Sequence, residues 1–311
     1  MLPEVEAWLR SRTSAAADWP LERLLAAKGG ARVSVVLPAR DERETVGEIV
    51  TAIRRDLAGL VDEIVVIDSR STDDTAVVAA RAGATVHAQD EILPDLKPLD
   101  GKGEALWKSL AATSGDLLVF VDADIRRFQS SFVTGLLGPL LTDPTVAYVK
   151  GCYDRPLLDA PTGGGRVTEL VARPLINLHW PELAGFVQPL AGEYAGRRSA
   201  LERVPFVTGY GVELGLLIDL LDLAGLDALA QVDLGAREHS HQSTEALGAM
   251  AGQIMLAAWS RLERQGRILP LHEPSVRLAQ FRRTPEGHQV LTRDVSVAER
   301  PPMITVEGGR P

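Results

Sequence analysis

The sequence predicts an α/β protein built on a large parallel sheet with helices packed on both faces. Short apolar runs rich in β-branched residues alternate along the chain with longer segments of helical periodicity. The runs are apolar throughout, which is typical of strands buried on both faces of a parallel sheet. The chain has 311 residues, 45% of them hydrophobic, so it is long enough to bury a large core.

The first 30 residues are predicted to form an N-terminal helical arm, 1–30. Amphipathic stretches cover residues 5–10 and 19–27, and two glycines, Gly29 and Gly30, separate them from the first β-rich run. We expect this arm to pack on the main body.

Residues 31–150 are predicted to form the main βαβ core. The predicted strands are 33–37, 63–67, 84–87, 116–121 and 146–149, and the predicted helices are 44–57, 73–82, 103–113 and 132–141. This alternation indicates a parallel sheet with helical crossovers.

The chain changes character after Gly151, and residues 151–243 are expected to form a second half of the molecule. Three consecutive glycines, 163–165, open a predicted helix, a stretch rich in proline and glycine covers 181–196, and a strongly apolar helix is predicted over 212–224.

Residues 244–311 are predicted to form a C-terminal helix and tail. The helix is expected over 244–265, and the tail after it, which contains several prolines and arginines, is expected to be irregular and to serve as an arm on a second subunit.

The composition excludes several classes of function. The formal net charge of −9 argues against a nucleic-acid partner, since such proteins present a basic face to the phosphates. No apolar run approaches the roughly 20 residues that span a bilayer, and acids occupy the opening segment where a secretory signal is basic and apolar. We therefore expect a soluble, cytoplasmic protein that does not bind membranes. The single cysteine, Cys152, excludes an internal disulfide and is interpreted as a small buried hydrophobic residue.

Two acids, Asp122 and Asp124, follow the apolar strand 117–121 directly, with Ala123 between them. In an open α/β sheet the ligand lies beyond the carboxyl ends of the strands, so these carboxylates are expected to face the binding crevice. Carboxylates together with diphosphate oxygens and water are the ligands that Mg²⁺ prefers. The pair therefore predicts a nucleotide-diphosphate site with Mg²⁺ or Mn²⁺, the alternative being an acidic turn that caps the next helix.

Polar groups also follow two other predicted strands. The first strand ends in a segment containing Glu42, and the second ends at Asp68 and Ser69, so polar groups gather at three strand ends. Neither a glycine-rich dinucleotide fingerprint nor a P-loop motif occurs, which argues against a dehydrogenase and against a P-loop enzyme. Glu42 and Asp68 are then free to accept hydrogen bonds from a ribose or a uracil.

Several segments together resemble a known family. Leu37-Pro38-Ala39-Arg40-Asp41-Glu42, Asp68-Ser69, Gly101-Lys102-Gly103 and Asp122-Ala123-Asp124 resemble the glycosyltransferases of the GT-A fold, which have a Rossmann-like nucleotide-binding sheet and an appended acceptor-binding half. Downstream segments narrow the likeness to the actinobacterial glucosyl-3-phosphoglycerate synthases, retaining enzymes of glycosyltransferase family 81: Lys150-Gly151, Asp154-Arg155-Pro156, Gly163 to Leu170 and Gly209-Tyr210-Gly211-Val212-Glu213. The likeness covers nearly the whole chain.

The resemblance implies a metal-dependent hexosyltransferase that moves glucose from UDP-glucose, or GDP-glucose, to the 2-hydroxyl of 3-phosphoglycerate with retention, and that forms a homodimer. The implied catalytic residues are Lys102, Asp124 and Glu213, and the implied metal ligands are Asp124 and His239. The implied nucleotide-sugar site comprises Pro38, Ala39, Glu42, Asp68, Ser69, Lys102, Asp122, Ala123 and Leu190.

The implied acceptor site comprises Gly165, Arg166, Thr168, Tyr210, Arg237 and His241. Backbone N–H groups at a glycine-rich helix start, with a guanidinium and a hydroxyl beside them, suit a phosphate or a carboxylate, and phosphoglycerate carries both. The chain departs from the mycobacterial members at His239-Ser240-His241, where they have His-x-Asn, and the linker 159–163 is shorter than theirs.

Three alternatives stay open at the level of sequence. A mannosyl-3-phosphoglycerate synthase would share nearly all of these residues. A polyprenyl-phosphate glycosyltransferase would share the strand-end acids but would be expected to have a membrane-binding segment. A non-catalytic nucleotide-sugar sensor would keep the donor site alone. The sequence also leaves open whether transfer occurs on one face of the sugar or by double displacement through Glu213.

Overall fold

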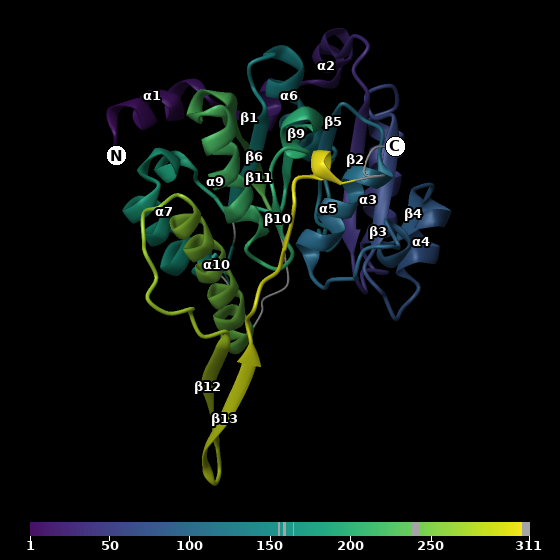
Figure 1. Cartoon of the computed structure of the whole chain (residues 1–311). Coiled ribbons are helices and arrows are strands. Elements are labelled where there is room, and N and C mark those ends of the chain that lie inside the picture. The colour runs from purple at the N-terminus through teal and green to yellow at the C-terminus, as the bar shows by residue number, and fades with distance from the viewer. Residues whose placement is uncertain (155, 158–159, 164, 238–242, 307–311) are drawn as a thin grey trace.

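The computed structural model describes the chain at residues 1–154, 156–157, 160–163, 165–237 and 243–306. One large sheet forms its centre (Figure 1). The strands of this sheet are β1 (Thr13–Ala15), β2 (Val33–Ala39), β3 (Glu63–Asp68), β4 (Thr85–Ala88), β5 (Leu117–Phe120), β6 (Tyr148–Asp154), β9 (Tyr194–Arg197) and β11 (Leu229–Ala236). The principal helices are α1 (Pro3–Ser11), α2 (Leu21–Lys28), α3 (Val46–Asp56), α4 (Thr75–Ala82), α5 (Lys102–Ala112), α6 (Ser131–Thr142), α7 (Arg173–His179), α8 (Arg198–Leu201), α9 (Val212–Ala224) and α10 (Thr244–Arg264).

The eight strands lie in the order β1, β11, β6, β9, β5, β2, β3, β4. All neighbouring pairs are parallel except those of β9, which runs antiparallel to both β5 and β6. The parallel core predicted for residues 31–150 is confirmed, with the ends of each element shifted by a few residues. Strand β9 was not predicted, because a four-residue strand in a stretch rich in glycine and proline has too little periodicity to be recognised.

The sheet separates two hydrophobic clusters, as its double-sided burial requires. Along β2, Val33, Val35 and Leu37 belong to one cluster, whereas Val36 belongs to the other. This alternation is the two-residue period of a strand, with both faces covered. It explains why the predicted strands are apolar throughout.

The N-terminal arm packs on the sheet as predicted and also adds a strand to it. The indole nitrogen of Trp8 on α1 donates to the carbonyl of Leu229 at 2.8 Å, and β1 pairs with β11, with Thr13 opposite Gln231. Strands β1, β9 and β11 were not predicted from the sequence.

The C-terminal tail is not irregular, so that prediction is wrong. Strands β12 (Arg277–Thr284) and β13 (Gly287–Asp294) form an antiparallel hairpin that projects from the body below α10 (Figure 1). Strand β14 (Glu299–Arg300) then returns to pair with β10 (Phe206–Val207). The two strands of the hairpin contain few apolar residues and several exposed arginines, so their sequences lack a clear alternation of apolar and polar residues. The pairing of β12 with β13 stabilises them.

After the three glycines the chain is helical, as predicted. A π-helical turn, Thr168–Ala172, runs directly into α7. No helix in the described part of the chain combines the length and apolar character needed to cross a membrane.

Candidate active site

A cavity of about 680 Å³ opens at the carboxyl ends of the central parallel strands. This is where an open α/β sheet binds its ligand. The cavity is lined by most of the residues predicted for the site: Pro38, Ala39, Glu42, Ser69, Lys102, Asp122, Ala123, Asp124, Gly165, Arg166, Thr168, Leu190, Tyr210, Glu213 and Arg237. Segments separated by up to 200 residues thus meet in one place.

One described residue of the predicted site is not part of this lining, and two others cannot be placed. Asp68 ends β3, but its carboxylate accepts from the Ser71 backbone N–H at 3.3 Å, and it is not among the residues that line the cavity. His239 and His241 lie outside the described residues.

Lys102 lies between two carboxylates in the cavity wall. Its Nζ is 2.5 Å from Oδ1 of Asp122 and 3.0 Å from Oε1 of Glu213. Burial opposes the charge of the ammonium, but Asp122 and Glu213 outweigh burial and raise the pKa of Lys102 above its ordinary value. The lysine therefore carries a positive charge at neutral pH and can exchange a carboxylate for a phosphate oxygen.

Glycines allow Lys102 to sit here. Gly101 has a φ of +111°, and a Cβ on it would lie 2.1 Å from the carbonyl oxygen of Thr208. Only glycine adopts this backbone conformation at so close an approach. The Gly101-Lys102-Gly103 segment singled out from the sequence is thus a tight turn that starts α5 at Lys102.

Arg237 forms ion pairs with three acids at the site. Its Nη2 lies 2.7 Å from Oδ1 of Asp124 and 3.1 Å from Oδ2 of Asp122, while its Nη1 lies 3.3 Å from Oε1 of Glu193. Burial opposes the charge on Arg237, but Glu193, Tyr153 and the aspartates outweigh it and raise its pKa. The structure thus places Arg237 against the Asp-x-Asp pair.

Glu193 was not predicted, although it is completely buried beside Arg237. Burial raises the pKa of its carboxyl group, and Arg237 opposes that shift. Glu193 directly precedes β9, and an antiparallel strand begins at the edge where its parallel neighbours end. A strand prediction at 194–197 would have placed Glu193 at the site.

Asp124 is suited to bind a divalent metal ion. Its carboxylate is partly exposed in the cavity and takes a cationic partner, the guanidinium of Arg237, so the position favours positive charge. Carboxylate oxygens match Mg²⁺ or Mn²⁺, which commonly use one or two protein carboxylates with phosphate oxygens and water. Among the described residues no group of three or more His, Cys, Asp or Glu side chains is arranged around a metal position.

Glu42 is, after Glu193, a second acid at the site whose pKa is raised. Burial, and after it the charge of Asp124, raises the pKa of Glu42 to about 7. Thr45, which opens α3, donates to the carbonyl of Ala123 at 2.6 Å and so fixes the turn between the two aspartates. The ends of β2 and β5 are thereby held together.

The predicted acceptor residues Gly165, Arg166, Thr168, Tyr210 and Arg237 line the same cavity. Gly165 has a φ of +77°, and Arg166 and Thr168 follow it at the start of the helical segment. Arg166 and Thr168 also line an adjoining cavity of about 630 Å³ that contains Cys152. The backbone N–H of Tyr210 donates to Oε1 of Gln253 on α10 at 3.0 Å. These residues bring the exposed phenol of Tyr210, the guanidinium of Arg166 and the hydroxyl of Thr168 to the cavity.

The burial of Lys150 was also not predicted. Lys150 on β6 is fully buried, with its ammonium 3.4 Å from the Tyr148 hydroxyl and 4.6 Å from the centre of the Tyr194 ring. Burial lowers the pKa of Lys150 to about 7. The sequence flagged Lys150 only as part of a motif, and nothing in the motif indicates burial.

Cys152 is buried, as the sequence interpretation expected. Burial, followed by the charges of Asp233 and Asp154, raises the pKa of its thiol to about 12. The reactive thiolate is therefore scarce at neutral pH, in agreement with a packing role.

Comparison with known proteins agrees with this site. A model of glycosyl transferase family 2 matches residues 34–185. The chain is 48% identical to a glucosyl-3-phosphoglycerate synthase from Mycolicibacterium paratuberculosis, with 97% of this chain and 92% of that protein covered. It is 43% identical to the protein of the same name from Petrotoga mobilis, covering 90% of this chain and 88% of the relative.

Solved structures show the same likeness. The crystal structure of a mannosyl-3-phosphoglycerate synthase from Rubrobacter xylanophilus has a TM-score of 0.90 at 42% identity and covers 96% of this chain and 97% of its own. The glucosyl-3-phosphoglycerate synthase of Mycobacterium tuberculosis, in complex with Mn²⁺, UDP and phosphoglyceric acid, has a TM-score of 0.83 at 46% identity and covers 92% and 95%. The architecture is the predicted GT-A fold. By its sequence along nearly its whole length and by its fold, this chain belongs to the glucosyl-3-phosphoglycerate synthases, which are hexosyl-transferring glycosyltransferases.

Proposed function

We propose that this protein transfers glucose from UDP-glucose to the 2-hydroxyl of 3-phosphoglycerate with retention of configuration, assisted by Mg²⁺ or Mn²⁺. One observation carries the proposal: Lys102 and Asp124, predicted for the donor, and Arg166 and Thr168, predicted for the acceptor, all line a single cavity. A donor diphosphate and an anionic acceptor can therefore bind at the same time. The relative from Mycobacterium tuberculosis was crystallised with Mn²⁺, UDP-glucose and phosphoglyceric acid.

The donor's diphosphate is proposed to lie between Lys102 and Asp124. Asp124, together with His239 as the family resemblance implies, would hold the metal ion, which would supply positive charge to the diphosphate oxygens. Lys102 gives up its pairing with Asp122 or Glu213 and donates to the leaving oxygen, where negative charge accumulates. Both side chains already line the cavity before the donor binds, and binding exchanges one ion pair of Lys102 for another.

The acceptor's phosphate and carboxylate are proposed to bind Arg166, Thr168 and the N–H groups at the start of the helical segment. This arrangement directs the 2-hydroxyl toward the anomeric carbon. The new C1–O bond forms as the bond from C1 to the diphosphate oxygen breaks, and the hydroxyl proton passes to that departing oxygen. Glu213 binds sugar hydroxyls and favours positive charge at the anomeric carbon.

Double displacement would instead require Glu213 to attack the anomeric carbon. Its carboxylate is buried and paired with Lys102 at 3.0 Å, an arrangement that favours electrostatic support over nucleophilic attack. Incubation of Glu213→Gln with UDP-glucose and azide tests this. A β-configured glucosyl azide would favour a glucosyl–enzyme route in which azide replaces the carboxylate, and its absence favours the same-face route.

A product assay tests the function. The enzyme would be mixed with UDP-glucose, GDP-glucose or GDP-mannose and with 3-phosphoglycerate, 2-phosphoglycerate or glycerate, and the products identified by mass and by NMR of the anomeric proton. We expect α-linked glucosyl-3-phosphoglycerate from UDP-glucose and 3-phosphoglycerate. Nucleotide release that does not depend on the acceptor would contradict the proposal.

Mannosyl transfer is a second candidate, favoured by the TM-score of 0.90 to the Rubrobacter xylanophilus synthase. The same assay separates the two, since a mannosyl enzyme would form product fastest from GDP-mannose.

We also propose that the protein is a homodimer. Several large apolar side chains are exposed on the segment around α7, the loop after α10 and the hairpin: Leu170, Leu178, Leu269, Leu271 and Phe281. The hairpin projects from the body and could reach a second subunit (Figure 1). Light scattering on the wild type and on Phe281→Glu would test this, with a dimer expected for the first and a larger monomer fraction for the second. A cytoplasmic location stays a prediction from the sequence.

A further inference from the structure

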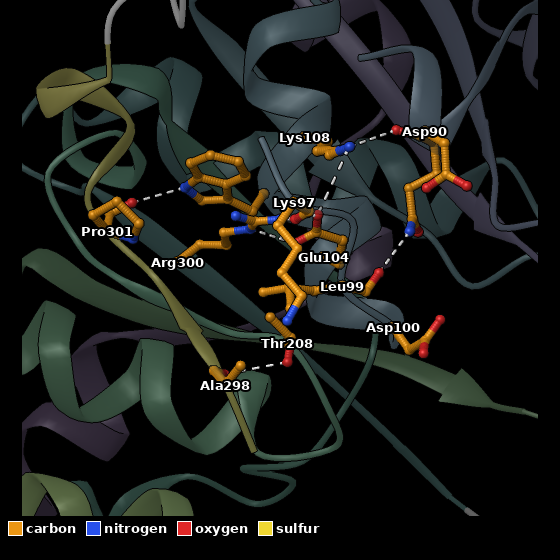
Figure 2. Close-up of polar contacts among 12 residues, drawn as sticks. Asp90, Lys97, Leu99, Asp100, Glu104, Lys108, Thr208, Ala298, Arg300 and Pro301 are labelled. Atoms are coloured by element: carbon orange, nitrogen blue, oxygen red, sulfur yellow. Dashed lines mark hydrogen bonds and ion pairs between the residues drawn. The ribbon is translucent and has the colours of Figure 1, made fainter. Parts of the chain in front are cut away.

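A buried ion pair joins the C-terminal strand β14 to the start of helix α5. Nε and Nη2 of Arg300 lie 2.7 Å from the two carboxylate oxygens of Glu104, as Figure 2 shows. Glu104 is completely buried and Arg300 is 8% exposed. The two residues are 196 positions apart in the sequence, and neither lines the cavity. Such a pair is costly to desolvate, and it acts as a clamp between two segments.

The same guanidinium holds the loop that leads into the active site. Nη2 of Arg300 donates to the carbonyl of Lys97 at 2.6 Å, and two residues further on the carbonyl of Leu99 accepts from Nε2 of Gln89 at 3.1 Å. Lys108 on α5 donates to the Gln89 carbonyl at 2.8 Å. The loop 97–101 is therefore tied at two carbonyls to the rest of the cluster in Figure 2.

The loop is also fixed from the side of β10. The N–H of Gly103 donates to the Thr208 carbonyl at 2.9 Å, and the Thr208 N–H donates to the carbonyl of Ala298, two residues before Arg300, also at 2.9 Å. A Cβ at Gly103 would lie 1.8 Å from the Val207 carbonyl oxygen. Lys102 is thus held between Thr208 on one side and the loop on the other, and the C-terminal segment contacts both.

We infer that Arg300 is a positioning residue for Lys102: it sets where the ammonium stands relative to Asp122, Glu213 and the donor diphosphate. The inference rests on the proposed role of Lys102. Glu104 lies two residues after Lys102 in the same first helical turn, so a shift of Glu104 is transmitted to Lys102 through rigid backbone. Displacement of a catalytic group by about 1 Å can cost on the order of 100-fold in rate.

The test uses two variants of the clamp and one control. Arg300→Lys keeps a charge for Glu104 but cannot also hold the Lys97 carbonyl, since an ammonium lacks the planar fork of a guanidinium. Arg300→Met/Glu104→Gln removes both charges, so no buried ion is left unpaired. The control is Arg198→Met, because Arg198 binds the carbonyls of Leu110 and Thr113 at the opposite end of the same helix.

Two measurements are made on each folded variant. Hydrogen–deuterium exchange of the amides in 97–104 reports the loop directly, and it needs no turnover. Steady-state kinetics with UDP-glucose and 3-phosphoglycerate report kcat and both KM values. We expect faster exchange in 97–104 and a fall in kcat of about tenfold or more for both clamp variants, with the acceptor KM within about twofold. Arg198→Met should change neither, even at an equal loss of Tm.

A double-variant cycle shows whether the clamp acts through Lys102. In a Lys102→Met background, Arg300→Lys should lower kcat by less than about threefold further, since the interaction that it supports is already gone. The inference is overturned if Arg300→Lys leaves exchange and kcat at wild-type values, if it costs the same tenfold without Lys102, or if Lys102→Met itself is fully active. Failure of the proposed function would look different: the wild type would form no glucosyl-3-phosphoglycerate, while the exchange experiment would still decide whether Arg300 holds the loop.

Discussion

Two buried cations, Arg237 and Lys150, interact electrostatically with the same acids, Glu193 and Asp122, and their immediate surroundings differ. Arg237 pairs with Asp122, Asp124 and Glu193. Lys150 rests against two tyrosines, and no carboxylate of the described residues forms an ion pair with it. The pKa of Arg237 is raised because the acids outweigh burial, whereas burial lowers that of Lys150 to about 7. The comparison teaches that pairing with acids, more than burial itself, decides whether a buried cation raises or lowers the stability of the folded protein.

The largest effect is expected from removing Asp124, the acid that pairs with Arg237 and is proposed to bind the metal. Asp124→Ala should lower kcat/KM by about 1000-fold or more in the presence of Mn²⁺ or Mg²⁺, which corresponds to about 4 kcal/mol. Product formation would be measured across a metal titration. Asp227→Ala, at the opposite end of the sheet before β11, is the control and should keep full activity; activity of Asp124→Ala that saturates normally with metal would contradict the assignment.

The next prediction concerns Arg237, the buried cation that is paired with acids. Arg237→Met leaves Glu193 buried without its guanidinium, so the free energy of unfolding should fall by about 3–5 kcal/mol. Urea denaturation at pH 7 measures it. Arg237→Met/Glu193→Gln should recover at least half of the loss, because no charge then remains buried. A single variant as stable as the wild type would show that Arg237 serves ligands and not the fold.

The unpaired side should respond with the opposite sign. Lys150→Met should raise the free energy of unfolding at pH 7 by on the order of 3 kcal/mol, because burial of the ammonium is no longer required. The folded pKa of about 7 lies below the value of about 10.4 in unfolded chains. Between these pH values the unfolded wild type binds more protons, so its stability rises with pH and the advantage of the variant shrinks.

Denaturation of wild type and Lys150→Met at pH 7 and pH 9.5 checks both the sign and the slope. Lys97→Met, at an exposed lysine, serves as the control and should show no such advantage. If the difference in stability between Lys150→Met and the wild type did not change with pH, the pKa of Lys150 would not be lower in the folded protein than in the unfolded chain.

The smallest effect sharpens the comparison with a third cation, Arg166, which lines the cavity and is predicted to bind the acceptor. Arg166→Ala should raise the KM for 3-phosphoglycerate about tenfold or more while the donor KM changes less than about threefold, since a charge-assisted contact contributes about 1.5–3 kcal/mol. Arg173→Ala is the matched control, because Arg173 pairs with Glu169 on the next helical turn. An unchanged acceptor KM in Arg166→Ala would refute the assignment of Arg166 to the acceptor site.

The sequence by itself determined the parallel core and the meeting of Glu42, Asp122 and Asp124 in one cavity. Both follow from local patterns: the apolar strands bury both faces, and Asp122, Asp124 and Glu42 come directly after such strands, so any parallel sheet brings them to one edge. The family resemblance also singled out Gly101-Lys102-Gly103, but only the structure shows that this segment is a tight turn.

Tertiary structure alone decided which buried charges are paired. Glu193 reaches Arg237 only because β9 inserts antiparallel between β5 and β6, and Arg300 reaches Glu104 only because β14 returns to β10 after the hairpin. Lys150 carries no mark of burial in its own segment. Pairing between residues far apart in sequence depends on strand order and burial, and short strands leave too weak a periodic pattern to fix either one in advance.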